Sequence, residues 1–268
     1  MKILAISDVV RWEGYEKIVD EIKPDVIVLA GNLTSDGFAC FWCSEWFEEN
    51  IPGFLKEERE LMRKFGNKWN ADLLNSLKEK YVNTKKFHET RKKLHVNRFY
   101  QFLKHAGKKS QVLVIRGNHD EDFEGDYVPE RINKIRECKE ISGKIVNTCG
   151  MRFLGLGFNE THYLRILKSL INACKGKVDI VIMHGENILA VSSIKPKLII
   201  RGGYVTGKYL VNGVPSFWNS WRVYTVINLE NKEIREISQY DVNRGTEVSW
   251  SLPKLQVQRY KWLKPYPI

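Results

Sequence analysis

Residues 111–120 read QVLVIRGNHD, an apolar run that passes directly into Gly117, Asn118, His119 and Asp120. A short apolar segment rich in β-branched residues predicts a buried strand over residues 111–115. In open α/β sheets, the loops after the carboxyl ends of parallel strands are where ligands usually bind. The stretch therefore indicates an α/β fold with polar, chemically useful side chains at the end of a central strand.

The first 36 residues predict a β-α-β unit. Residues 2–7 form an apolar run, residues 14–22 carry apolar side chains at helical spacing, and Pro24 ends that helix before a second apolar run over residues 26–30. A continuous apolar strand after a helix is typical of a parallel sheet that is covered on both faces. Asp8 and Gly31-Asn32 follow the two strands.

The remaining chain continues with strands that end in polar loops. The expected elements are a helix over 129–138, a hairpin of 144–146 with 151–155, a helix over 163–174, strands over 178–183 and 197–200, a hairpin of 223–229 with 233–237, and a tail over 239–268. His184 ends one of these strands, and Gly202-Gly203-Tyr204-Val205 follows another. This order predicts two mixed sheets with helices outside them.

Asp8, Gly31-Asn32, Gly117-Asn118-His119-Asp120, His184 and Gly202-Gly203-Tyr204-Val205 follow one another as the motifs of a known family do. The chain resembles the calcineurin-like metallophosphoesterases, whose motifs read D-x-H, G-D, G-N-H-[ED], H and G-H-x-H. The resemblance covers about residues 1–238 outside an insertion. It implies an α/β four-layer αββα sandwich of two mixed sheets, and a single domain over residues 1–268.

The resemblance also implies a phosphoesterase chemistry, in which two metal ions share a hydroxide that attacks phosphorus. Carried over by position, the metal ligands would be Asp8, Asn32, Asn118 and His184, and His119 would be the catalytic histidine. Four expected ligands are replaced, at Val10, Asn32, Gly203 and Val205. One carboxylate cannot readily hold two dications, so we expect one divalent metal (Mn, Zn or Fe) or none, rather than two.

Other acidic or histidine side chains near the motif loops could replace the missing ligands. They are Asp36, Asp120, Glu121, Glu186 and His162. Acidic loop residues are more commonly solvated or cap helices. We therefore expect no rebuilt site from these residues.

A helical insertion of about residues 44–109 separates the second and third motifs. Its second half, residues 78–109, contains eleven basic and two acidic residues with aromatic residues between them. The basic residues that we expect to bind anions or nucleic acid are Lys85, Lys86, Arg91, Lys92, Lys93 and Arg98. In such a role, the cations would contact phosphates and the aromatic residues would stack on bases. A simpler alternative is an amphipathic helix pair whose aromatic residues point inward.

Two functions follow from this sequence. The first is phosphoester hydrolysis by a reduced, single-metal or weak site. The second is a non-catalytic pseudo-phosphoesterase that binds nucleic acid, a nucleotide or a protein through its basic insertion. The partner would be a phosphorylated small molecule or nucleic acid.

The overall composition favours anionic partners, because the formal net charge is +11 and the isoelectric point is about 9.3.

The chain has five cysteines, an odd and sparse set that predicts reduced thiols rather than a disulfide framework. Cys40 and Cys43 form a C-x-x-C pair without a second pair to complete a zinc site, and we interpret them as packed thiols. No apolar run is long enough to cross a bilayer. We expect a cytoplasmic protein without membrane contact.

Overall fold

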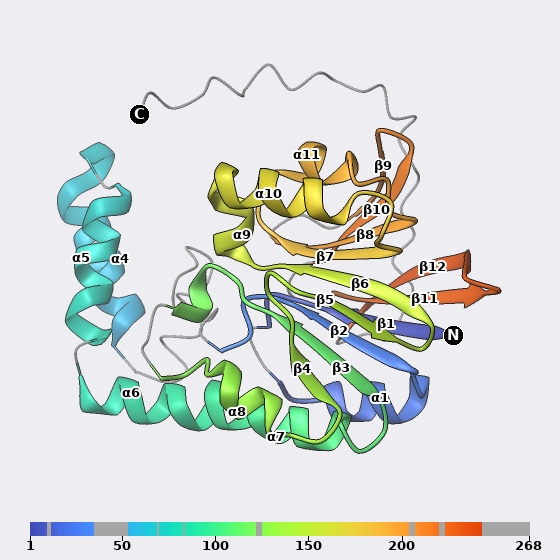
Figure 1. The fold of residues 1–268 in the computed structure, drawn as a ribbon. Helices are drawn as coiled ribbons and strands as arrows, with labels where there is room; N and C mark the ends of the chain where they lie inside the picture. The colour runs from blue at the N-terminus through green and yellow to red at the C-terminus, as the bar shows by residue number, and fades with distance from the viewer. Residues whose placement is uncertain are drawn as a thin grey trace.

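The computed structural model describes residues 1–9, 12–34, 53–68, 70–82, 84–121, 125–203, 207–219 and 223–242. Two mixed sheets of six strands each face one another (Figure 1). The first has the order β12-β11-β1-β2-β3-β4, with β1 Lys2–Ile6, β2 Val26–Ala30, β3 Gln111–Ile115, β4 Cys138–Glu140, β11 Val223–Glu230 and β12 Glu233–Asp241. The second has the order β5-β6-β7-β8-β10-β9, with β5 Ile145–Thr148, β6 Met151–Leu156, β7 Ile180–His184, β8 Leu198–Gly202, β9 Gly207–Val211 and β10 Val214–Asn219.

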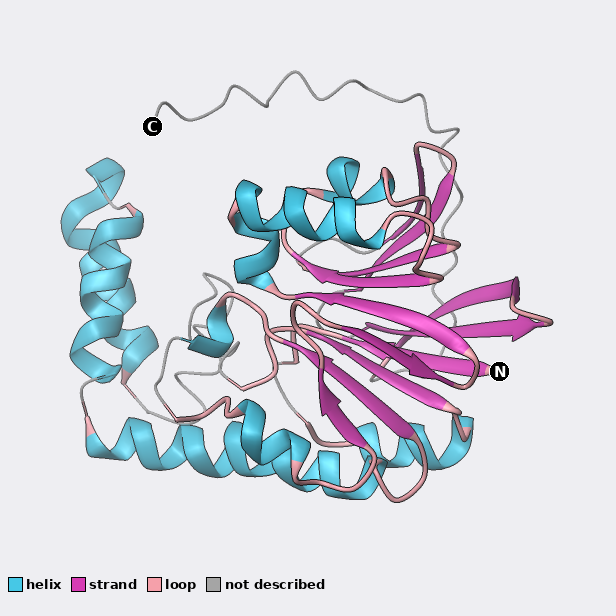
Figure 2. Ribbon diagram, viewed as in Figure 1, coloured by secondary structure: helices cyan, strands magenta, loops and turns pink. Residues whose placement is uncertain are grey.

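Strand alternation divides the apolar residues into three cores. Along β2, Val26, Val28 and Ala30 point into the core between the sheets, whereas Ile27 and Leu29 point to the outer core of the first sheet. This is the period of two expected for a strand that is buried on both faces. A third core lies between the second sheet and its helices. The predicted four-layer αββα sandwich is confirmed (Figure 2).

Helices cover the two outer faces. On the first sheet they are α1 Tyr15–Ile22, α7 Asn97–Ala106 and α8 Pro129–Asn133, and on the second α9 Phe158–His162, α10 Leu164–Cys174 and α11 Ile188–Ser192. Trp12 packs in the outer core of the first sheet against Phe99 and Phe102 of α7, at ring distances of 5.5 and 4.7 Å. Of the helices that the structure describes, none combines the length and apolar character needed to cross a membrane.

The expected insertion contains two different parts. Helices α4 Phe54–Phe65 and α5 Ala71–Val82, with the short η2 Gly66–Lys68 between them, stand beside the sandwich in Figure 1. Lys80 and Tyr81 of α5 both bond the carboxylate of Glu57 on α4, at 2.6 and 2.8 Å. Helix α6 Lys85–Arg91 then continues through the π-helical segment η3 Lys92–Val96 into α7, which belongs to the outer layer of the sandwich.

Several sequence-based element predictions need correction. The helix predicted over 129–138 ends at Asn133, and Cys138 begins the edge strand β4 instead. Main-chain pairing with β3 from Val112 onward decides this, because it needs a partner far away in the sequence. Helix α11 and the β9–β10 hairpin were not predicted, and β12 continues to Asp241, beyond the predicted start of the tail. Cys40, Cys43 and residues 243–268 lie outside the described residues.

Candidate metal centre

The loops after β1, β2 and β3 and the end of β7 bring all four predicted metal ligands together. Asn32 hydrogen-bonds both Asp8 and Asn118, and His184 Nε2 lies 3.0 Å from Asn118 Oδ1, although Asp8 and His184 are 176 positions apart. Asp8 and Asn32 both adopt left-handed backbone conformations, with φ of 52° and 57°. Aspartate and asparagine tolerate this region better than other side chains because their short polar groups bond locally.

The side-chain amide of Asn32 is fully engaged within this group. Its Oδ1 accepts from the backbone N–H of His119 at 3.0 Å, which fixes the orientation of the amide. Its Nδ2 therefore points the other way and donates to Asp8 Oδ1 at 3.0 Å and to Asn118 Oδ1 at 3.2 Å. The position at which the family carries a bridging carboxylate thus presents hydrogen-bond donors to two predicted metal ligands.

The carboxylate of Asp8 is buried and both of its oxygens accept N–H groups. Asn32 Nδ2 bonds Oδ1, and the backbone N–H of Gly203 bonds Oδ2 at 2.8 Å. Burial raises the pKa of Asp8, while the interaction with His184 and hydrogen bonds from Ser7, Asn32 and Gly203 oppose that shift. Gly203 was expected to replace a histidine ligand, and here its main chain supplies a hydrogen bond to Asp8.

The imidazole of His184 is buried between the sheets and its two nitrogens face oxygen atoms. Nδ1 lies 2.8 Å from the carbonyl oxygen of Ala30, so Nδ1 is the donor, and Nε2 lies 3.0 Å from Asn118 Oδ1. The ring fits because Gly31 and Gly202 leave room: a Cβ at either residue would lie 2.6 or 2.8 Å from His184 Nδ1. Gly31 also has a φ of +85°, which favours glycine.

His119, the predicted catalytic histidine, is half-buried at the start of the short helical turn η4 His119–Glu121. Its Nε2 lies 3.0 Å from Asn118 Nδ2. Since Asn118 Oδ1 already accepts from Asn32, its Nδ2 is the donor to His119. His119 therefore belongs to the same hydrogen-bonded group as the predicted ligands.

Asp120 is a structural residue that sequence reasoning did not identify. Its buried carboxylate accepts the N–H groups of Asn32, Leu33, Thr34 and Gly117 and the hydroxyl of Thr34, at 2.6–3.0 Å. These bonds hold the loop after β2 against the loop after β3. A carboxylate occupied in this way is not a replacement metal ligand. The signal in the sequence is only the position of Asp120 after Gly117-Asn118-His119.

Of the other candidate replacements, the two whose side chains the structure describes do not complete a metal site. Glu186 and His162 are exposed, and the His162 ring stacks on Phe158 at 5.1 Å. Val10, Val205 and Asp36 lie outside the described residues, and the side chain of Glu121 is likewise not described. Within the part of the chain that the structure describes, no three His, Cys, Asp or Glu side chains gather as a metal-binding group.

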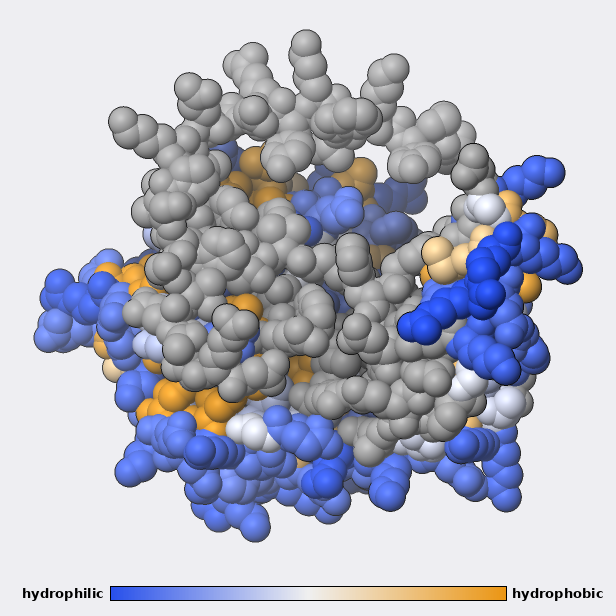
Figure 3. Space-filling view, turned by 180° about the vertical axis from the view of Figure 1, so that it is seen from behind, coloured by the Kyte–Doolittle hydropathy of each residue, from blue (hydrophilic) through white to orange (hydrophobic). Residues whose placement is uncertain are grey.

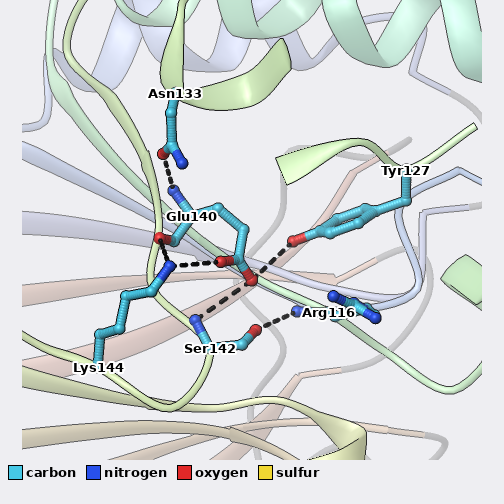
Figure 4. Close-up of polar contacts among 6 residues, drawn as sticks. All are labelled: Arg116, Tyr127, Asn133, Glu140, Ser142 and Lys144. Atoms are coloured by element: carbon cyan, nitrogen blue, oxygen red, sulfur yellow. Dashed lines mark hydrogen bonds and ion pairs between the residues drawn. The ribbon is translucent and has the colours of Figure 1, made fainter. Parts of the chain in front are cut away.

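A second polar cluster supports the Gly117-Asn118 loop from the side of the edge strand (Figure 4). The backbone N–H of Arg116 donates to Ser142 Oγ at 3.1 Å, and the N–H of Ser142 donates to Glu140 Oε1 at 3.2 Å. Lys144 and Tyr127 also bond the buried Glu140 carboxylate, at 3.3 and 3.5 Å. Burial, followed by the charge of Glu140, raises the pKa of Tyr127. These hydrogen bonds tie the end of β3 to the edge strand β4 and the segment after it.

The donor set does not fit two metal ions. Both oxygens of Asp8 accept N–H groups, and the amide of Asn32 directs hydrogens where a bridging carboxylate would direct oxygens. The pair formed by His184 Nε2 and Asn118 Oδ1 does fit one cation, because both atoms are acceptors in a neutral His184 and lie 3.0 Å apart. Among the residues that the structure describes, this pair is a position suited to one metal.

The structure divides the predicted anion-binding residues. Lys85, Lys86, Lys92, Lys93 and Arg98 are exposed on one side of α6, η3 and α7. Arg91, in contrast, is 3% exposed and forms an ion pair with the buried Asp126, so it does not belong to this surface. The interleaved residues Phe87, Phe99, Tyr100 and Phe102 are buried. The simpler alternative, with aromatic residues inward, is what the structure shows for these four.

The chain matches one family model and several solved structures. The family model of calcineurin-like phosphoesterases matches residues 1–265. Among solved structures, TT1561 of Thermus thermophilus matches with a TM-score of 0.54 and 11% identity, over 90% of this chain and 98% of that one. GAP50, the anchor in the inner membrane complex of Plasmodium, matches with a TM-score of 0.49 and 10% identity, over 93% and 87%. YfcE, a phosphoesterase from E. coli, matches with a TM-score of 0.41 and 11% identity, over 93% and 97%. No curated protein matches.

Proposed function

From the premise that this chain belongs to the calcineurin-like phosphoesterase family, we propose that it is a non-hydrolytic member that acts by binding an anionic partner. The observation that carries the proposal is the amide of Asn32, which donates to Asp8 Oδ1 and Asn118 Oδ1. The family uses divalent metals, and a pair of cations requires ligand atoms with lone pairs. In this chain, an N–H donor points instead at two of the predicted ligand oxygens, Asp8 Oδ1 and Asn118 Oδ1.

The electrostatics of the centre support this proposal. A buried carboxylate needs opposite charge or hydrogen-bond donors to remain stable. Asn32 and Gly203 provide donors to Asp8, and His184 interacts with it electrostatically. We therefore expect the centre to be stable without a metal, as a scaffold that keeps the strand-end loops in place.

Calorimetric titration of chelator-stripped protein with Mn²⁺ tests this proposal. We expect fewer than two equivalents to bind, and no Mn²⁺-stimulated hydrolysis of bis(4-nitrophenyl) phosphate. The His184→Ala variant removes the His184 imidazole from the centre. His162→Ala removes an exposed histidine and serves as the matched control. Two equivalents in the wild type and in His162→Ala, lost in His184→Ala, would overturn the proposal.

A second candidate function rests on the 3.0 Å contact of His184 Nε2 with Asn118 Oδ1. These two acceptors would hold one divalent cation, with the negative charge of Asp8 close by. The cation would supply Lewis-acid stabilisation of charge on a phosphoryl group. His119 would act as the general acid after its Nε2 gives up the hydrogen bond from Asn118 and takes up a proton.

The same titration separates the two candidates. The single-metal hydrolase predicts one equivalent of Mn²⁺, lost in His184→Ala and retained in His162→Ala. It also predicts hydrolysis that His119→Ala reduces by about 10²-fold or more, the usual range for a general acid. Metal binding without hydrolysis would leave the non-hydrolytic proposal in place.

A further inference from the structure

The basic side of α6, η3 and α7 is one continuous helical surface in the structure. These three elements follow one another without a break from Lys85 to Ala106. Figure 1 places α6 and α7 along the lower border of the molecule, and the lowest border of Figure 3 is hydrophilic. This surface lies on the outer face of the first sheet, away from the second sheet.

The π-helical segment Lys92–Val96 sets the alignment of this surface. An α-helix turns about 100° per residue, so on an unbroken helix Lys85 and Lys104 would point about 100° apart. A π-turn accommodates one additional residue, which shifts the helical phase back by about one residue, or about 100°. The complete burial of both Phe87 and Phe99 agrees with this phase. The two side chains would point about 120° apart on an unbroken α-helix, and about 20° apart once the π-turn is counted.

With this phase, the cationic residues fall into two neighbouring rows. Lys85, Lys92 and Lys104 form one row, and Lys86, Lys93 and Arg98 form the other. All six are exposed. The acidic residue on this side is Glu89, which lies 3.7 Å from Lys85 in an exposed pair. The rows extend over about 28 Å, calculated from 1.5 Å per residue.

The types of side chain that this surface exposes indicate which class of partner it can bind. The aromatic residues between the cations are buried, so the surface has no stacking platform of the kind that single-stranded nucleic acid uses. Among residues 85–106, no large apolar side chain that the structure describes is exposed, so the described part of this surface does not present the apolar anchors typical of protein interfaces. Straight rows of positive charge match the phosphates of a duplex, which repeats about every 34 Å.

We propose that α6, η3 and α7 bind the phosphate backbone of double-stranded nucleic acid without reading its sequence. The inference deepens the proposed function, since it names the anionic partner and the surface that holds it. It is nevertheless independent of the metal centre. Loss of duplex binding would leave the titration result at His184 unchanged, and metal binding at His184 would leave duplex binding unchanged.

Fluorescence anisotropy of the full chain with a 24-base-pair DNA duplex, at salt concentrations from about 50 to 200 mM, tests this inference. Each phosphate contact contributes about −0.9 to the slope of log K against log salt. Lys92→Gln/Lys93→Gln and Arg98→Gln/Lys104→Gln should each make the slope less steep by up to about 2. Both pairs should do so on the same duplex, because they lie on one surface across the π-turn.

Arg165→Gln/Lys168→Gln is the matched control, since it removes two exposed cations from α10 on the opposite face of the sandwich. This pair should leave the slope unchanged. Gln101 is exposed on α7 between the two cationic rows, so Gln101→Lys should tighten binding and steepen the slope by up to about 0.9. Circular dichroism of every variant checks that the helices remain folded.

Three results would overturn the inference. The first is equal loss of binding in the control pair and in the two test pairs. The second is tighter binding to the single strand of the same sequence than to the duplex. The third is displacement of the duplex by poly-glutamate at equal charge concentration, which would indicate an acidic protein partner instead.

Discussion

The Nδ2 atom of Asn32 lies 3.0 Å from Asp8 Oδ1 and donates a hydrogen bond to it. The same nitrogen donates to Asn118 Oδ1 at 3.2 Å. One amide therefore links the ends of three neighbouring strands of the first sheet. It acts as a hydrogen-bond donor at the position where the family has a carboxylate that bridges two cations.

Asn32→Asp should convert this link into a cluster of acceptors. The new carboxylate could still accept from the N–H of His119, but its second oxygen would face Asp8 Oδ1 and Asn118 Oδ1 without a hydrogen between them. We expect the free energy of unfolding in chelator to fall by about 3 kcal/mol, as for an uncompensated buried charge. Urea denaturation at neutral pH measures this change.

Added Mn²⁺ should restore stability to Asn32→Asp and raise its Tm more than it raises that of the wild type, because a ligand that binds the folded state stabilises it. Asn172→Asp, on the exposed side of α10, is the control for the added charge. If Mn²⁺ shifts both variants equally, the amide of Asn32 does not decide metal binding.

Asp120→Asn should loosen the loop after β2. An asparagine oxygen can accept some of the five hydrogen bonds, but its NH₂ group would face N–H donors that now have no acceptor. We expect a loss of about 2–4 kcal/mol, since each buried donor left unsatisfied costs about 1–3 kcal/mol. Thermal denaturation of Asp120→Asn beside the exposed Asp72→Asn measures this effect, and equal midpoints would refute it.

Arg91→Met should destabilise the fold because it leaves the buried carboxylate of Asp126 without its cation. Breaking one partner of a buried ion pair costs about 3–5 kcal/mol. Arg98→Met removes an exposed cation about two helical turns away and should change stability by less than about 0.5 kcal/mol. The double variant Arg91→Met/Asp126→Leu should regain most of the loss. If Arg91→Met and Arg98→Met prove equally mild, the ion pair is not structural.

Cys138 should resist alkylation at about pH 8. Burial raises the pKa of its thiol to about 12, with a smaller contribution from Glu137. Because the raised pKa favours the neutral thiol, the stability that this group contributes is fully present below its unfolded pKa of about 9 and is lost as the pH rises from there through about 12. The thiolate fraction at that mildly alkaline pH is then roughly 10⁻⁴, and the thiolate is the reactive form.

Mass spectrometry of peptides after brief iodoacetamide treatment measures this difference. The exposed Cys149 should be labelled first, and Cys138 only after unfolding. Comparable labelling of both thiols in the native protein would contradict the expected burial of Cys138.

Much of the fold could be predicted from local sequence patterns. The apolar runs before Asp8, Asn32 and Asn118 have the length and composition of buried strands, and the structure confirms strands at all three. Cys138 shows where such reasoning ends. It was predicted to end a helix, but it pairs with Val112 in a parallel strand. A local pattern cannot show that partner.

The sequence by itself determined the four-layer sandwich, the family and the meeting of Asp8, Asn32, Asn118 and His184 at one edge. The α/β class and the buried strands follow from strand periodicity, which is local. The four-layer sandwich and the set of predicted ligands follow from the resemblance of the ordered strand-end motifs to the family. Only the tertiary structure decided that the Asn32 amide turns its hydrogens toward Asp8, that Arg91 is buried with Asp126, and that a π-turn aligns the lysines of α6 with those of α7. The physical reason is that hydrogen-bond direction, burial and helical phase depend on atoms contributed by segments far apart in the chain.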